Sequence, residues 1–266
     1  MNFNTPSKIS IITPSFNQDA YIDQTIQSVL KQNYPDFEHI VIDGGSTDRT
    51  VQILKSYEHL VWISEKDRGQ ADALNKGLRY AKGDVIGWIN SDDYYESNIF
   101  KFVMDQFYRP ETQWVIGNLT YQFDGIGTLI PNKSPVVSYE RLIRNPDIVK
   151  QAPAFFRRSF LERVGGWNPD FFMVMDFDLW VRLSKCSPPK MVDHNWAYFR
   201  IHSMQKTSIS NTQRQLMEIV QVLKRESVPL SITARVYTRK QCHALKSLLK
   251  NMFIEAGLCK TNLFTL

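Results

Sequence analysis

Short apolar runs alternate with amphipathic segments over the first 90 residues. Four runs are rich in β-branched residues and predict strands at 8–15, 37–46, 60–64 and 84–89. The segments between them place apolar residues at helical spacing and predict helices at 19–32, 47–57 and 69–83. Gly83 is expected to cap the last of these helices. This alternation predicts an α/β fold with a mostly parallel central sheet and helices on both faces.

The alternation weakens after residue 110. The apolar runs there predict strands at 113–123, 127–131 and 196–202, with a hairpin across Asp124-Gly125. Helices are predicted at 159–167, with a glycine stop, and at 175–186. The stretch 210–256 predicts two helices broken near Pro229.

Polar residues follow each of the four N-terminal strands. They are Pro14, Ser15 and Asn17, then Asp43, then Glu65 and Asp67, and finally Asp92 and Asp93. A single polar loop is ordinary, but ligands of open α/β sheets bind beyond the carboxyl ends of the strands. Four such loops on one rim therefore predict a ligand site.

Asp92 and Asp93 are the most informative of these residues. Two adjacent carboxylates repel each other and contribute nothing to a core. Mg²⁺ or Mn²⁺ held against substrate phosphates would offset their charge, because these hard ions prefer oxygen ligands. An N-cap for the following helix is the alternative explanation. The sequence contains no glycine-rich phosphate loop, which disfavours kinases and NAD enzymes.

Two further regions carry candidate chemistry. Asp176 and Asp178 are two residues apart, so on a helix they point about 200° apart and cannot share one task. Arg182 lies four residues after Asp178 and can pair with it, which leaves Asp176 as a candidate general base or as a helix cap. His202 follows a strand and is either a surface residue or a ligand of metal or phosphate.

Composition and charge narrow the class of protein. Apolar residues make up 43% of the 266 residues, yet no run of eighteen is apolar, and the N-terminus does not resemble a secretory signal. Three cysteines without metal-type spacing suggest a reduced, cytoplasmic protein. Residues from Lys206 onward carry ten Lys and Arg against three Asp and Glu, so the first 205 residues have a net charge of 5 − 7 = −2. This distribution disfavours nucleic-acid binding and suits an anionic membrane surface.

Several stretches together resemble the family 2 glycosyltransferases of the GT-A fold. They are "ITPSFNQDAYIDQTIQSVLKQNYPDFEHIVIDGGSTDRT", "DRGQADALNKGLRYAKGDVIGWINSDD", "GGWNPDFFMVMDFDLWVRL" and "FRIHSMQKTS". The resemblance implies a GT-A domain over 1–208, with a nucleotide-binding half at about 1–110 and an acceptor half at about 111–208. The remainder, 209–266, is then a helical C-terminal extension.

The resemblance also implies roles for single residues. Residues for the nucleotide-sugar are Pro14 and Asn17 beside the nucleotide, Asp43 on the base, Asp72 near the nucleotide or donor sugar, and Asp92 on ribose or donor sugar. Asp93 would bind the metal, His202 would help hold the metal or the diphosphate, and Asp176 would be the catalytic base. Two positions depart from the family's usual pattern, because Asn90 and Met175 stand where acidic residues are common.

These roles imply an inverting, Mn²⁺- or Mg²⁺-dependent transferase. It would move a sugar from a nucleotide-diphosphate donor, expected to be a UDP-sugar, to a hydroxyl of a saccharide or lipid-linked glycan in cell-surface polysaccharide biosynthesis. The alternatives are a polyprenyl-phosphate sugar synthase, which needs no base, and a nucleotide-sugar-binding relative without activity. A cytoplasmic location is expected. The basic helix at 234–258 either lies on the inner membrane face or packs on its own domain.

Overall fold

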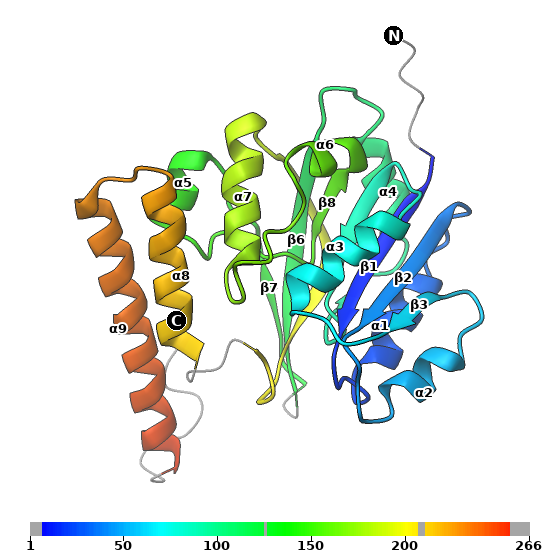
Figure 1. The fold of residues 1–266 in the computed structure, drawn as a ribbon, viewed down its shortest axis with the longest axis horizontal. Helices are drawn as coiled ribbons and strands as arrows, with labels where there is room; N and C mark the ends of the chain where they lie inside the picture. Colours follow the sequence, from blue (N-terminus) through cyan, green and yellow to red (C-terminus); the bar gives the residue numbers. More distant parts are fainter. Residues whose placement is uncertain (1–6, 125–126, 207–210, 256–266) are drawn as a thin grey trace.

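The computed structural model describes residues 7–124, 127–206 and 211–255, with side chains described as far as Cys242. Within these ranges the chain forms one mixed sheet with helices on both faces, as predicted (Figure 1). No helix among these residues combines the length and the apolar character needed to cross a bilayer.

The N-terminal half contains the predicted parallel sheet. Its strands are β1 (Ile9–Ser15), β2 (Phe37–Asp43), β3 (Val61–Ser64) and β4 (Val85–Trp88). They lie in the order β3-β2-β1-β4, and each neighbouring pair is parallel. The connecting helices are α1 (Ile22–Leu30), α2 (Thr50–Lys55) and α3 (Gln70–Tyr80). The carboxyl ends of the four strands therefore meet on one edge of the sheet.

The second half adds strands of both directions. They are β5 (Tyr94–Tyr95), β6 (Trp114–Phe123), β7 (Leu129–Asn132), β8 (Ala154–Arg157) and β9 (Lys190–Ile201). β8 lies antiparallel between β4 and β6, whereas β6 and β9 are parallel. The predicted hairpin between β6 and β7 is confirmed. The strands β5 and β8 were not predicted, and β5 has only two residues, too few for a readable alternation.

The remaining helices are α4 (Ile99–Gln106), α5 (Tyr139–Arg144), α6 (Arg158–Arg163), α7 (Met175–Cys186), α8 (Thr212–Arg225) and α9 (Leu230–Glu255). Adjacent residues of β1 show how the two faces are covered. Ile11 points into a cluster with residues of α1 and α4, whereas Ile12 points into a cluster with residues of α3, α7 and α8. The predicted helix at 175–186 is confirmed, and so is the break near Pro229.

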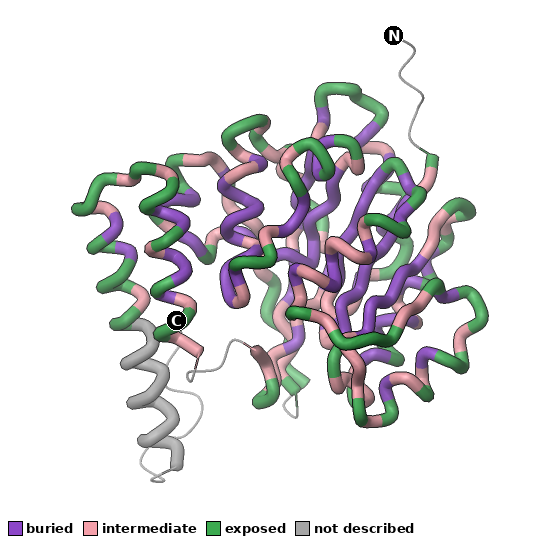
Figure 2. The backbone as a smooth tube through the Cα atoms, viewed as in Figure 1, coloured by how far each residue is buried: buried purple, intermediate pink, exposed green. Residues whose placement is uncertain are grey.

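The described part of the C-terminal extension packs on the rest of the fold. α8 buries Ile219, Val222 and Leu223 in the same apolar cluster as Trp114 of β6. Figure 2 shows this buried side of α8, and Figure 1 shows α8 and α9 side by side at the edge of the molecule. The apolar positions from Leu245 to Phe253 lie outside the described side chains.

Gly83 does not cap α3, contrary to the prediction. The helix ends at Tyr80, and its C-cap Ala81 is already extended. A Cβ on Gly83 would come within 2.5 Å of the Ser10 backbone nitrogen, so this glycine allows close contact with β1. The predicted glycine stop after α6 is confirmed, because Gly165 and Gly166 both have positive φ.

Candidate active site

A cavity of about 630 Å³ opens at the carboxyl edge of the parallel strands. Pro14, Asp67, Asp92 and Asp176 are among the residues that line it. The predicted rim is therefore a real concave site. The other five predicted side chains, Asn17, Asp43, Asp72, Asp93 and His202, do not belong to its lining.

Asp92 and His202 come together beside this cavity. Asp92 follows the end of β4, and His202 follows the end of β9. The Nε2 atom of His202 lies 3.1 Å from Oδ2 of Asp92. The His202 side chain is almost fully buried, and its ring lies 4.5 Å from that of Tyr21, centroid to centroid. Its other ring nitrogen, Nδ1, is buried without a hydrogen-bond partner among the described residues.

Asp93 points away from the cavity into the protein. One carboxylate oxygen accepts a hydrogen bond from the Arg200 backbone N–H at 3.0 Å, and the other accepts one from Nε2 of Gln151 at 3.1 Å. Burial, reinforced by the neighbouring charge of Asp92, raises the pKa of Asp93 well above its usual range. Both oxygens already have partners, so the structure places Asp92 rather than Asp93 at the cavity surface.

Asp43 and Asn17 hold loops together beneath the rim. The fully buried Asp43 carboxylate accepts hydrogen bonds from the backbone N–H groups of Gly45 and Ser46 and from the hydroxyls of Ser46 and Ser64. Asn17 has a φ of 51° and accepts a hydrogen bond from the Thr47 N–H at 2.8 Å. The partners of Asp43 and of the Asn17 oxygen are internal, so both side chains order the loops beneath the rim, and their contact with a nucleotide stays a prediction.

Asp72 is engaged on the flank of α3. Its carboxylate lies 3.7 Å from Nζ of Lys76 and 3.8 Å from the guanidinium of Arg68. Asp67, by contrast, lines the cavity and faces Gly44, where an added Cβ would come within 2.9 Å of the Asp67 carboxylate. Burial raises the pKa of Asp67. The sequence placed Asp67 on the rim without giving it a role.

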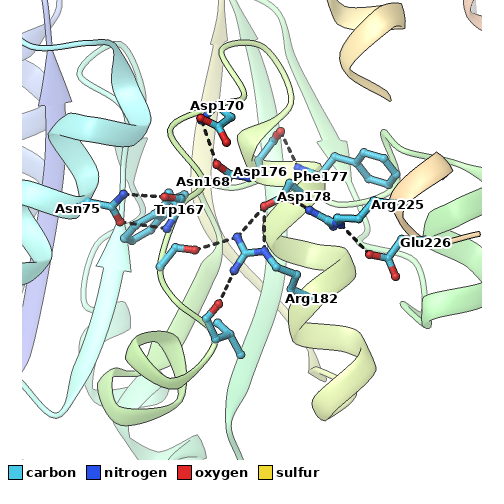
Figure 3. Close-up of polar contacts among 12 residues, drawn as sticks. Asn75, Trp167, Asn168, Asp170, Asp176, Phe177, Asp178, Arg182, Arg225 and Glu226 are labelled. Carbon is cyan, nitrogen blue, oxygen red and sulfur yellow. Dashed lines mark hydrogen bonds and ion pairs between the residues drawn. The ribbon is translucent and has the colours of Figure 1, made fainter. Parts of the chain in front are cut away.

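Asp176 and Asp178 divide their tasks as the helical spacing predicted. Asp176 lines the cavity, and its carboxylate accepts the Phe177 N–H at 2.8 Å. Burial raises the pKa of Asp176. The fully buried Asp178 instead accepts hydrogen bonds from Arg182, at 2.9 and 2.7 Å, and from Arg225 of α8 (Figure 3).

Lys206 is a cavity residue that the sequence did not single out. Its ammonium donates a hydrogen bond to Oε1 of Gln70 at 3.2 Å and lies 4.0 Å from the ring centroid of Phe172. Burial lowers the pKa of Lys206 to about 8. In the sequence this lysine counted as the first charge of the basic tail, and although it lies in the stretch "FRIHSMQKTS", only the histidine of that stretch was given a role.

The residues around Asp92 fit a divalent cation. Asp92 offers oxygen and His202 offers imidazole nitrogen, and both donors suit Mn²⁺. No group of three or more His, Cys, Asp or Glu side chains that could hold a metal occurs within the described ranges. Such a pair is typical of a cation held by few protein ligands together with substrate phosphates.

Solved structures identify the class of this fold as GT-A. S. aureus TarS in complex with UDP superposes with a TM-score of 0.65 at 20% identity, covering 87% of this chain and 71% of that chain. The mannosyltransferase PcManGT from Pyrobaculum calidifontis in complex with GDP-Man and Mn²⁺ gives 0.61 at 17% identity, covering 97% and 77%.

The chain belongs to glycosyl transferase family 2, whose family model matches residues 10–165. An uncharacterised glycosyltransferase of Mycobacterium tuberculosis is 30% identical over 186 residues, which are 68% of this chain and 70% of that protein. Chondroitin synthase of Escherichia coli is 29% identical over 213 residues, covering 78% of this chain. The match spans only 31% of that synthase. The protein is therefore a glycosyltransferase, as the sequence resemblance implied.

Proposed function

We propose that the protein transfers a sugar from a nucleotide-diphosphate donor to a hydroxyl of a saccharide or lipid-linked glycan, with a divalent cation and with inversion. One observation carries this proposal. A single cavity is lined by Asp92, the candidate base Asp176 and the half-buried cation of Lys206, and His202 contacts Asp92 from behind this lining. The nucleotide complexes of TarS and PcManGT, which share the fold, support a nucleotide-sugar donor.

Asp92 and His202 are the proposed ligands for Mn²⁺ or Mg²⁺. Sequence resemblance gave the metal to Asp93, but the hydrogen bonds that Asp93 makes inside the protein favour Asp92. When bound, the cation would offset the charge that develops on the departing diphosphate. Asp93 would then support the loop from beneath.

Asp67 is proposed to read the nucleotide base in place of Asp43. A carboxylate accepts a hydrogen bond from the ring N–H of uracil or guanine, whereas cytosine and adenine present an unprotonated ring nitrogen there. Asp67 lies at the end of β3, three strands from β4 and Asp92, and Gly44 leaves room beside it. UDP remains the expected nucleotide, with GDP as the second choice.

Lys206 is proposed to pair with the diphosphate. Its pKa of about 8 keeps the ammonium charged at neutral pH, and its burial strengthens the attraction to an anion. Pro14 would contribute a wall of the nucleotide site, because it lines the cavity at the end of β1.

Asp176 is proposed to remove the proton of the acceptor hydroxyl. That oxygen then attacks the anomeric carbon from the face opposite the diphosphate, so one displacement inverts the configuration. A raised pKa suits a general base, because the proton-transfer driving force increases. The position of Asp176 on the cavity favours a hydroxyl acceptor over the polyprenyl-phosphate alternative, since a phosphate needs no base.

The relatives support a polysaccharide acceptor. They include a chondroitin synthase and a putative teichuronic acid biosynthesis glycosyltransferase of Bacillus subtilis, TuaG, which is 41% identical over 96 residues. A lipid-linked acceptor would place the enzyme in the cytoplasm on the inner membrane face. Flotation with vesicles rich in anionic lipid tests this location, and equal recovery with neutral vesicles would remove the electrostatic argument.

Calorimetry with a panel of nucleoside diphosphates tests the proposed function. We expect UDP or GDP to bind in Mn²⁺ and binding to collapse in EDTA. Release of the diphosphate from matching nucleotide sugars, with and without added saccharides, then separates a transferase from an inactive relative. Failure of every nucleotide to bind in Mn²⁺ would overturn the proposal.

A further inference from the structure

Residues 172–174 lead into α7, the helix that carries the candidate base Asp176, and they are held by a side chain from α8. One oxygen of the Glu218 carboxylate accepts the Phe172 N–H at 3.2 Å. The other accepts the N–H groups of Met173 and Val174, at 2.6 and 3.2 Å. Asp176 follows two residues after Val174, so these bonds fix the backbone from which the candidate base projects.

This arrangement supports the start of α7. The N-cap residue of α7, Val174, has no side chain that can accept a hydrogen bond, and the first N–H groups of any helix need partners. A carboxylate near a helix N-terminus is also favoured by the helix dipole. Of the three N–H groups that Glu218 accepts, one belongs to this N-cap residue and two belong to the residues before it, so Glu218 fixes the start of α7 from another helix.

Glu218 is poorly explained as ordinary core packing. Only 6% of the residue is exposed, and a buried carboxylate carries a desolvation cost that an apolar side chain would avoid. Its neighbours on α8, Leu216 and Ile219, are buried apolar residues. The three backbone bonds and a fourth from Nε of Arg214 at 2.9 Å offset that cost.

The contacts of Glu218 also involve Phe172, a side chain that lines the cavity. Phe172 lines the cavity, with the Lys206 ammonium 4.0 Å and the Arg214 guanidinium 4.2 Å from its ring centroid. Arg214 is in turn bonded to Glu218. The glutamate thus connects α8 with the segment from which Asp176 projects, whereas Lys206 has its own hydrogen bond to Gln70 of α3.

We propose that Glu218 is a positioning residue for the transfer reaction and that α8 belongs to the catalytic unit. The inference rests on the role proposed for Asp176, and it concerns a helix that lies beyond the residues matched by the family model. Displacing a reacting group by about 1 Å can lower a rate by about 100-fold. Loss of Glu218 therefore lowers turnover, whereas Lys206 keeps its hydrogen bond to Gln70 of α3 and Asp92 keeps its place after β4.

Two substitutions of different severity test the proposal. Glu218→Gln keeps one accepting oxygen, whereas Glu218→Met keeps the shape and removes both. We expect kcat to fall about 10-fold in the first and about 100-fold in the second, with calorimetric affinity for the nucleotide diphosphate within about twofold of wild type. All rates are measured at a temperature well below the melting temperature of each variant.

Glu226→Gln is the matched control. Glu226 is a similarly buried glutamate at the end of α8, but it pairs with the side chains of Lys185 and Arg225 and bonds no backbone of the segment 172–174. We expect it to lower the melting temperature and leave kcat within about twofold.

Three outcomes would overturn the proposal. They are a kcat within twofold in both Glu218 variants, an equal loss of kcat in Glu226→Gln, or a parallel loss of nucleotide affinity. Asp176→Asn is measured alongside. Full activity of that variant would remove the proposed base, whereas an inactive Asp176→Asn beside normal Glu218 variants would remove the positioning role alone.

Discussion

Nε2 of His202 lies 3.1 Å from a carboxylate oxygen of Asp92, although 110 residues separate the two in sequence. β9 delivers the histidine and β4 delivers the aspartate, so the pair depends on the complete sheet. Asp93, adjacent to Asp92, is turned the other way and bonded to Gln151 and Arg200. Neighbouring carboxylates therefore have different surroundings.

Asparagine substitutions of Asp92 and Asp93 should differ in their effect on metal-dependent nucleotide binding. Asp92→Asn should abolish the Mn²⁺-dependent part of nucleotide binding, because a neutral amide is a poor ligand for a hard cation. Asp93→Asn should keep that binding, because its amide can bond the unpartnered Oε1 of Gln151 if the Gln151 amide turns over. Calorimetry in Mn²⁺ and in EDTA measures both. Loss of metal dependence in Asp93→Asn alone would restore the metal role to Asp93.

Asp176→Asn should separate chemistry from binding. Turnover should fall by about 10²–10⁴-fold, the usual contribution of a general base, with little change in nucleotide affinity. Because burial raises the pKa of Asp176 and the base acts ionised, wild-type kcat/KM should fall as pH drops through a pKa above the ordinary value of about 3.9. A pH profile measures this limb. Equal losses in turnover and affinity would count against the assignment.

Lys206 should produce the opposite limb of the same profile. Pairing with a diphosphate needs the ammonium form, so kcat/KM should decline as pH rises through about 8. Lys206→Met should lower donor affinity and flatten the profile on the alkaline side. An alkaline limb that persists in Lys206→Met must come from another group.

Asp67 should set the choice of base. Asp67→Ala should weaken UDP or GDP binding by about tenfold, the cost of one charge-assisted hydrogen bond. The same variant should bind CDP and ADP no worse than wild type does, because those bases give Asp67 no ring N–H. Calorimetry across the four nucleotides measures the selectivity, and an unchanged preference would place base recognition elsewhere.

Asp178 should matter for stability more than for chemistry. Removing the fully buried carboxylate leaves Arg182 with only the carbonyls of Val164 and Gly166 and Arg225 with only Glu226, and the loss should approach the lower end of the about 3–5 kcal/mol typical of a broken buried ion pair. Urea denaturation of Asp178→Ala measures the loss in the free energy of unfolding. Asp193→Ala, which removes an exposed pair with Lys133, should leave the unfolding midpoint unchanged. Similar midpoints for the two variants would contradict the proposed role of burial.

The sequence predicted the strands and helices that form the site better than it predicted the direction of the side chains on them. The strand ends and the helix at 175–186 were predicted because periodicity reports which backbone is regular. Asp43 is the last residue of β2 and Asp92 follows β4. Asp43 turns inward to four hydrogen-bond donors of the next loop and of β3, whereas Asp92 faces the cavity. Loop conformation decides this direction, and residue type does not encode it.

Long-range partners were also beyond the sequence. The i,i+4 pair of Asp178 with Arg182 could be predicted, because helical spacing is local. The contacts of Arg225 and Glu218 could not, because α8 meets α7 only after the chain has passed through β9. Lys206 was hidden for the same reason.

β4 pairs parallel with β1 on one side and antiparallel with β8 on the other, so the two halves of the enzyme join along a single strand. Engineers who recombine donor and acceptor preferences between relatives would naturally cut the chain after this strand. The contacts of Glu218 of α8 with residues 172–174 limit where a second junction between the two parental sequences can be placed. Segments 172–186 and 212–226 should be inherited from one parent. A hybrid that mixes them would lose the hydrogen bonds between Glu218 and the segment before Asp176, the proposed base.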